Sequence, residues 1–249
     1  MEIPIRQLAY RQIKFWRYAK GMNFEDFKGH IYLIDDDPSI SRSLAFALGQ
    51  SNYSVQTFND PESFLRDSLP LSPAVILLDM CMPQMQGVEL QKRLLQSGRE
   101  TPIIFISGES QPQEIVTAMK QGAIEFLLKP FGMSTLLSAI ENGLTRDRAH
   151  HTQLVRKLEI STRFKRLTDK EREVCSLMIR GFGNKEISEI NGSAPATVKL
   201  HRSRVLDKMG IDSLPELVDM AMSDTNFMEM LQDNTPAQHR QGPLLDTDA

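Results

Sequence analysis

Five short apolar runs, separated by segments of helical period, limit the fold of this chain more than any other feature. The runs are partly β-branched, as buried strands are, and they cover residues 31–34, 53–58, 74–78, 103–107 and 125–128. A helix follows each run, the last beginning near Met133, and Asp37 with Pro38 after it is expected to cap the first helix. Strands that alternate with helices form a parallel sheet covered on both faces. The sequence therefore predicts an α/β domain with a doubly wound, parallel, five-stranded sheet.

A chain of 249 residues has room for two domains of ordinary size, and its hydrophobic share of 41% supplies a core for each. The sheet domain is expected over residues 29–144, and its last helix continues over residues 145–165 as a basic helical linker. Short amphipathic helices punctuated by glycines predict an all-α domain over residues 166–223. A polar C-terminal tail is expected over residues 224–249.

Residues 1–28 are basic and aromatic and do not continue the strand and helix pattern. Two interpretations stay open. The extension is not native and Met22 is close to the true start, or the segment is a basic amphipathic contact for a membrane surface or a partner. No run is long enough for a membrane span, and the only two cysteines, Cys81 and Cys175, lie far apart. We therefore expect plain thiols, a cytoplasmic protein and no membrane partner.

Five polar residues stand at the carboxyl ends of the predicted strands. Asp35 and Asp36 follow the first strand, and Asp79, Ser107 and Lys129 end the third, fourth and fifth. In a flavodoxin-like sheet with strand order 2-1-3-4-5, a ligand binds between the carboxyl ends of the first and third strands. Carboxylates gathered there suit Mg²⁺. Asp79 is then a nucleophile for a phosphoryl group, with the metal and Lys129 offsetting negative charge and Ser107 donating to the phosphate.

This arrangement resembles the CheY-like receiver domain of bacterial two-component response regulators over about residues 30–145. The family places an acidic pair, an aspartate, a serine or threonine, and a Lys-Pro pair at these strand ends, and the chain matches each position. The resemblance implies that a sensor histidine kinase phosphorylates Asp79, that the backbone carbonyl of Cys81 is a further Mg²⁺ ligand, and that the bond before Pro130 is cis. It also implies that Ser107, Phe126 and Pro130 form the switch. Phe126 lacks the hydroxyl of the commoner tyrosine, so a hydrogen-bonded switch does not carry over.

Residues 184–210 contain a helix, a glycine turn and a second helix, which is the order of a helix-turn-helix. The second helix is locally basic, although the formal net charge of the chain is −3. A local basic patch on such a chain predicts contact with DNA. The residues expected to face a small core are Ile187, Ile190, Val198, Val205 and Met209.

The segments LTDKEREV, NKEI and TVKLHRSRVLDKMG resemble the DNA-binding domain of NarL/FixJ (LuxR-type) regulators. By residue matching, the resemblance places Lys199, Leu200 and Ser203 against base edges. The residues that it implies as phosphate contacts are Asn184, Lys185, Thr197, His201 and Arg202. Ser203 replaces a longer basic residue of some members, so base preference at this position does not carry over.

Together these features predict a DNA-binding transcription regulator that a sensor histidine kinase phosphorylates on Asp79. Its expected partners are promoter DNA, RNA polymerase and, once phosphorylated, a second copy of itself. No enzyme activity on external substrates is expected. Two alternatives stay open: a phosphorylation-independent DNA-binding regulator with a vestigial receiver, and a metal-dependent phosphohydrolase. For the phosphohydrolase, residues 35–39 offer three adjacent aspartates but the chain has no cap insertion.

Overall fold

The computed structural model describes residues 27–67 and 71–233 and divides into two compact units between His151 and Thr152. The interpretations of the N-terminal extension concern residues that lie almost wholly outside these ranges. No helix within the described ranges combines the length and apolar character that a membrane crossing needs.

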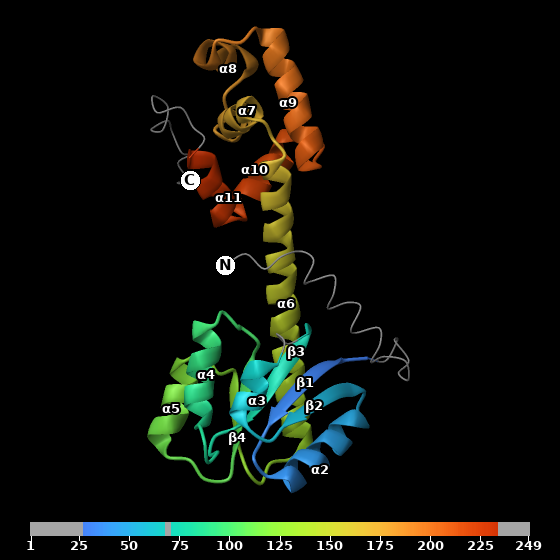
Figure 1. Cartoon of the computed structure of the whole chain (residues 1–249). Helices are drawn as coiled ribbons and strands as arrows, with labels where there is room; N and C mark the ends of the chain where they lie inside the picture. Colours follow the sequence, from blue (N-terminus) through green and yellow to red (C-terminus); the bar gives the residue numbers. More distant parts are fainter. Residues whose placement is uncertain (1–26, 68–70, 234–249) are drawn as a thin grey trace, which may run out of the picture. The chain divides into compact units, whose positions relative to one another are not determined.

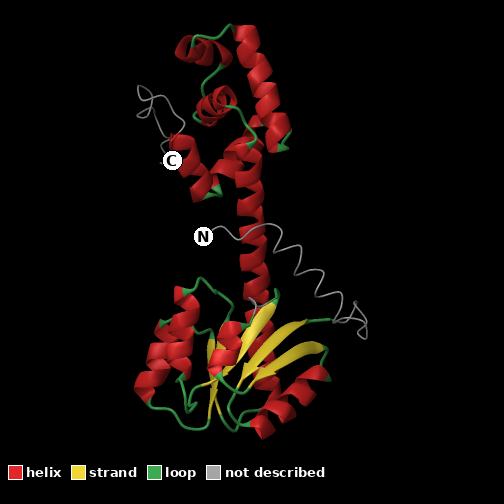
Figure 2. Cartoon of the chain, viewed as in Figure 1, coloured by secondary structure: helices red, strands yellow, loops and turns green. Residues whose placement is uncertain are grey.

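The first unit contains a five-stranded sheet in which all neighbouring strands are parallel (Figure 2). The order across the sheet is β2-β1-β3-β4-β5, so the predicted fold class and strand order are confirmed. Pairing of Ile34 with Leu78 brings the carboxyl ends of β1 and β3 side by side. The strands are β1 (Gly29–Ile34), β2 (Tyr53–Phe58), β3 (Ala74–Asp79), β4 (Ile103–Ser107) and β5 (Glu125–Leu128).

Helices cover both faces of the sheet because alternate residues of each buried strand point to opposite sides (Figure 1). Ile34 and Leu78 pack with one set of helices, α3 (Pro61–Arg66), α4 (Gly87–Gln96) and α5 (Pro112–Lys120). Leu33 and Leu77 pack on the other face with α2 (Pro38–Gly49) and the first part of α6 (Met133–Lys165). Burying each such side chain contributes about 1.5–3 kcal/mol.

The start of α2 is capped as predicted. The Asp37 carboxylate accepts hydrogen bonds from the backbone nitrogens of Ser39 (2.7 Å) and Ile40 (3.3 Å), and Pro38 opens the first turn. This cap satisfies two backbone donors at the start of α2, which begins three residues after Asp35.

The second unit is all helical and has its own core. Its helices are α7 (Asp169–Ile179), α8 (Asn184–Asn191), α9 (Pro195–Met209), α10 (Leu214–Met222) and α11 (Thr225–Asp233). Gly192 ends α8 with φ of 69°, a left-handed conformation that favours glycine. The predicted core residues face inward: Ile187, Val198, Val205 and Met209 are buried, and Ile190 packs against them while partly exposed.

Helix α11 corrects the expectation of a polar tail from residue 224. Phe227 and Leu231 lie one helical turn apart, and both are buried in the core of the second unit. The Phe227 ring meets the Phe164 ring edge-on, with centroids 5.3 Å apart, and Asp224 accepts a hydrogen bond from the Phe227 nitrogen. The polar composition of the segment hides these two apolar anchors, so composition alone did not predict the helix.

Candidate phosphoryl acceptor site and DNA-binding helix

Lys129 connects two buried carboxylates at the carboxyl edge of the sheet. Its ammonium nitrogen lies 2.9 Å from Asp35 Oδ2 and 2.8 Å from Asp79 Oδ1. Asp35 is 1% exposed and Asp79 is 6% exposed, so water screens this contact little. The three residues come from the ends of β1, β3 and β5, where the strand order brings them together.

Backbone groups fix the orientation of both carboxylates. Asp35 Oδ1 accepts from the nitrogen of Asp37 at 2.9 Å, and Asp79 Oδ2 accepts from the nitrogen of Cys81 at 2.8 Å. Gly87, at the start of α4, allows the close packing behind Asp79. A Cβ atom there would lie 2.6 Å from the Asp79 carbonyl oxygen. The sequence analysis did not single out Gly87, because the absence of a side chain is required there only by the close approach of β3.

The site has more negative than positive charge. Burial raises the pKa of Asp79, and the neighbouring Asp35 charge adds to this rise, while hydrogen bonding and charge from Lys129 act against it. Burial alone would lower the pKa of Lys129, but the hydrogen bonds and charges of Asp79 and Asp35 raise it. The site therefore favours a charged lysine and can accommodate further positive charge beside Asp79.

The oxygen donors of the site suit a hard divalent cation, although the side chains are not gathered as a preformed metal cluster. Within residues 27–67 and 71–233, no three acidic, histidine or cysteine side chains lie close enough together to hold a metal ion. Asp36 is exposed, and Lys129 lies against the two buried carboxylates. The excess of carboxylate charge nevertheless fits Mg²⁺ with several retained waters. The predicted ligands Asp35, Asp36, Asp79 and the Cys81 carbonyl stay a prediction.

Ser107 is buried, and its hydroxyl both donates and accepts a hydrogen bond. It donates to the Glu109 carbonyl oxygen at 2.8 Å and accepts from the Ser110 hydroxyl at 2.8 Å. The sequence analysis did not identify Ser110, although a second serine three residues beyond a strand end is a signal that could have found it. Cys81 is exposed, and its thiol lies 3.2 Å from the same Glu109 carbonyl.

The other predicted switch residues lie beside this loop. Phe126 is partly buried and stacks with Phe105, with ring centroids 6.1 Å apart. The Lys129–Pro130 peptide bond is cis, as the receiver resemblance implied. Their roles in switching stay a prediction.

The exposed face of α9 presents most of the predicted DNA contacts. Lys199, Leu200 and Ser203 are exposed, and the apolar Leu200 is 49% exposed. Thr197 at the start of α9 is exposed as well, as are Asn184 and Lys185 at the start of α8. The arrangement therefore offers polar and basic side chains from the beginnings of two helices.

His201 and Arg202 are less available than the sequence suggested. Arg202 is partly buried, and its Nη1 atom donates to the Phe182 carbonyl oxygen at 3.2 Å. The Nδ1 atom of His201 is buried without a hydrogen-bond partner among the described residues. A DNA contact from Arg202 would have to use its remaining guanidinium donors, and one from His201 would have to use Nε2.

A partly buried ion pair that the sequence analysis missed connects α9 to α7. Lys208 Nζ lies 2.5 Å from Glu171 Oε2, and Glu171 is 2% exposed. Burial alone would raise the pKa of Glu171, but hydrogen bonds from Lys208 and from Thr168 outweigh it and lower the pKa. The sequence does show the capping box that Glu171 forms with Thr168 three residues before it, but this pattern gives no sign of Lys208.

Comparison with known proteins assigns both units. Residues 31–141 match the response regulator receiver domain, and residues 165–221 match the bacterial regulatory proteins of the luxR family. The tetrathionate response regulatory protein TtrR of Salmonella typhimurium is 37% identical over 188 residues, which are 76% of this chain and 89% of that protein. The transcriptional regulatory protein FixJ of Bradyrhizobium diazoefficiens is 38% identical over 197 residues, which are 78% of this chain and 95% of FixJ. This chain is a response regulator of the NarL/FixJ family.

The fold agrees with this assignment. The solved structure of the response regulator StyR is 36% identical, with a TM-score of 0.74, and the match covers 79% of this chain and 100% of StyR. A NarL/FixJ response regulator is a transcription factor and not an enzyme. It joins a receiver domain that phosphorylation controls to a helix-turn-helix DNA-binding domain, and it works with a sensor kinase. Receiver domains typically bind Mg²⁺ at the phosphorylation site.

Proposed function

We propose that Asp79 is the residue of this response regulator that accepts the phosphoryl group. The buried contact of Lys129 with Asp79 and Asp35 carries the proposal, because it places a nucleophilic carboxylate beside a fixed cation. A carboxylate oxygen of Asp79 forms a bond to phosphorus while the bond between phosphorus and the donor histidine of the kinase breaks. Lys129 offsets charge on the phosphoryl oxygens.

Mg²⁺, when bound, supplies further positive charge to the phosphoryl oxygens, and its ligands would be Asp35, Asp36, Asp79 and the Cys81 carbonyl. Ser107 is buried at the adjacent strand end, where its hydroxyl can turn to the phosphoryl group. It must then give up its hydrogen bond to the Glu109 carbonyl. Loss of that bond changes the loop after β4. Phe126 on β5 and Pro130 just after β5 would transmit the change.

The output is promoter binding through α9. Phosphorylation shifts the population toward a homodimer, which suits two half-sites about one helical turn apart. Lys199, Leu200 and Ser203 would face base edges. The proposed phosphate contacts are Asn184, Lys185, Thr197, His201 and Arg202. The dimer would act on RNA polymerase at the promoter, in the cytoplasm.

The test is the intact mass of the full chain after incubation with Mg²⁺ and a small acyl phosphate. The wild type should gain one phosphoryl group, and Asp79→Ala and an EDTA-treated sample should gain none. Asp219→Asn, on an exposed aspartate of α10, is the matched control and should gain the group normally. If the wild type gains nothing from either the acyl phosphate or its sensor kinase, the receiver is vestigial and the proposal is wrong.

A further inference from the structure

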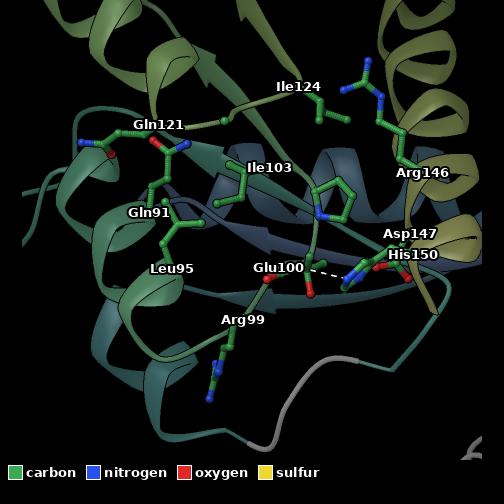
Figure 3. Close-up of a pocket in the computed structure, with 13 residues that line it drawn as sticks. Gln91, Leu95, Arg99, Glu100, Ile103, Gln121, Ile124, Arg146, Asp147 and His150 are labelled. Atoms are coloured by element: carbon green, nitrogen blue, oxygen red, sulfur yellow. Dashed lines mark ion pairs between the residues drawn. The ribbon is translucent and has the colours of Figure 1, made fainter. Parts of the chain in front are cut away.

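A cavity of about 240 Å³ lies in the first unit at the amino-terminal edge of the sheet, opposite the edge that carries Asp79 (Figure 3). Ile103 at the start of β4 and Ile124 just before β5 line it, together with Gln91 and Leu95 of α4, the turn directly after α5 and residues 146–150 of α6. Neither phosphoryl transfer nor DNA binding uses this cavity.

One side of the cavity carries hydrogen-bond acceptors that lack donors. Gln91 is 1% exposed, and its amide nitrogen donates to the Ala118 carbonyl oxygen at 3.1 Å. Its Oε1 atom is buried and has no hydrogen-bond partner among the described residues, and the same is true of Gln121 Oε1. A buried acceptor without a donor is costly, so this side of the cavity favours an occupant with N–H groups.

The opposite side comes from α6 and carries a free cation (Figure 3). Arg146 is exposed and forms no ion pair with any residue in the described ranges. The neighbouring polar side chains already have partners: His150 Nε2 lies 2.9 Å from Glu100 Oε2, and Asp147 accepts hydrogen bonds from the Ser72 hydroxyl and from the Ala74 nitrogen. Arg146 is therefore the group on this side that can bind an anion from solution.

We infer that this cavity binds a small zwitterion of the amino-acid class. Its N–H donors would satisfy Gln91 Oε1 and Gln121 Oε1, and Arg146 would bind its carboxylate. Ile103 and Ile124 form an apolar wall for its carbon chain. The volume lies below the roughly 300–1,000 Å³ of pockets for drug-sized ligands, which restricts the occupant to a small molecule.

The experiment measures the thermal midpoint of the full chain, without acyl phosphate and with EDTA, against the common amino acids. Amines that lack the carboxylate and acids that lack the amine are the paired probes. An amino acid present at about 100 times its Kd should raise the midpoint of the receiver transition by roughly 10 °C, and its paired probes should have much smaller effects.

Two variants locate the site. Gln91→Leu removes the unpaired acceptor at similar volume and Arg146→Gln removes the cation, and each should abolish the shift. Gln96→Leu, on an exposed glutamine of α4 that does not line the cavity, should retain it. If Gln91→Leu fails to fold, Arg146→Gln alone decides the test, because Arg146 is exposed and its replacement leaves the core intact.

Two outcomes overturn the inference. If no amino acid shifts the midpoint, buried water alone satisfies the glutamines. If a shift survives in both variants, the ligand binds elsewhere. Phosphorylation takes no part in this measurement, so a negative result leaves the role proposed for Asp79 untouched.

Discussion

Replacing Lys208 with methionine removes the ammonium group that faces the buried Glu171 carboxylate. Breaking a fully buried ion pair costs about 3–5 kcal/mol, and an exposed pair contributes only about 0–1 kcal/mol. Glu171 is 2% exposed but the Lys208 side chain is 32% exposed, so this pair lies between the two cases. The start of α7 continues to stabilise the carboxylate. We expect Lys208→Met to lower the free energy of unfolding of the second unit by about 2 kcal/mol.

The effect should depend on pH. The folded-state pKa of Glu171 is below its ordinary value of 4.5. A lowered carboxylate pKa contributes stability that is present above the unfolded-state value and is lost as the pH falls through the folded-state value. The wild type and Lys208→Met should therefore differ most near pH 7, and the difference should start to shrink below about pH 4.5 and vanish once the pH is below the folded-state pKa.

Native-state hydrogen exchange read by mass spectrometry measures the change, because peptides from α7 and α9 report on this unit separately from the receiver. Lys170→Met breaks the pair between the exposed Lys170 and the partly exposed Glu173 and is the matched control, with an expected change of at most about 0.5 kcal/mol. Glu171→Gln keeps the capping box and removes the unpaired carboxylate charge. Combined with Lys208→Met, it should therefore recover part of the lost free energy of unfolding. Equal exchange in wild type and Lys208→Met, or a loss independent of pH, would refute the reasoning.

Four further changes test other contacts. Lys129→Met leaves Asp35 and Asp79 without their shared cation and should lower the receiver's thermal midpoint by roughly 10 °C, part of which Asp79→Asn should restore in the double variant; an unchanged midpoint contradicts this. Lys185→Ala should weaken binding to promoter and scrambled DNA alike and reduce the salt slope by about 1; a loss confined to the promoter argues against a phosphate contact. Leu200→Ala should change base preference in a binding selection and leave the salt slope unchanged, and an unaltered preference contradicts a base contact. Phe227→Ala should lower the free energy of unfolding of the second unit by about 3–5 kcal/mol, visible as faster amide exchange in α11, and wild-type exchange rates would exclude this packing role.

Features that depend on neighbouring residues were predictable from the sequence. The apolar runs matched the five strands within one or two residues at each end, because period and length distinguish a buried strand from a helix locally. The Asp37 cap was equally local, since donor and acceptor lie two and three residues apart. The placement of Asp35, Asp79 and Lys129 at one edge followed from strand order alone.

Contacts between distant segments could not be predicted in the same way. Glu171 and Lys208 are 37 residues apart, and no pattern in either helix shows that they meet. Arg202 looked available for DNA because its engagement with Phe182 depends on the turn before α8. Helix α11 was missed because its two anchors are buried only in the folded unit, where Phe227 meets the Phe164 ring and Leu231 joins the same core.

The sequence by itself determined the doubly wound sheet, the helix-turn-helix and the set of polar residues at the strand ends, because each depends on periodicity, capping or order along the chain. Only the tertiary structure decided that Lys129 contacts both buried carboxylates, that Ser107 is held by Glu109 and Ser110, and that Gln91 Oε1 has no donor among the residues that the structure describes. The physical reason is range. Strand period and helix caps depend on residues a few positions apart. Burial and the distances between charges are set only when distant elements pack together, as at the ends of β1 and β5, where Asp35 and Lys129 are 94 residues apart in sequence.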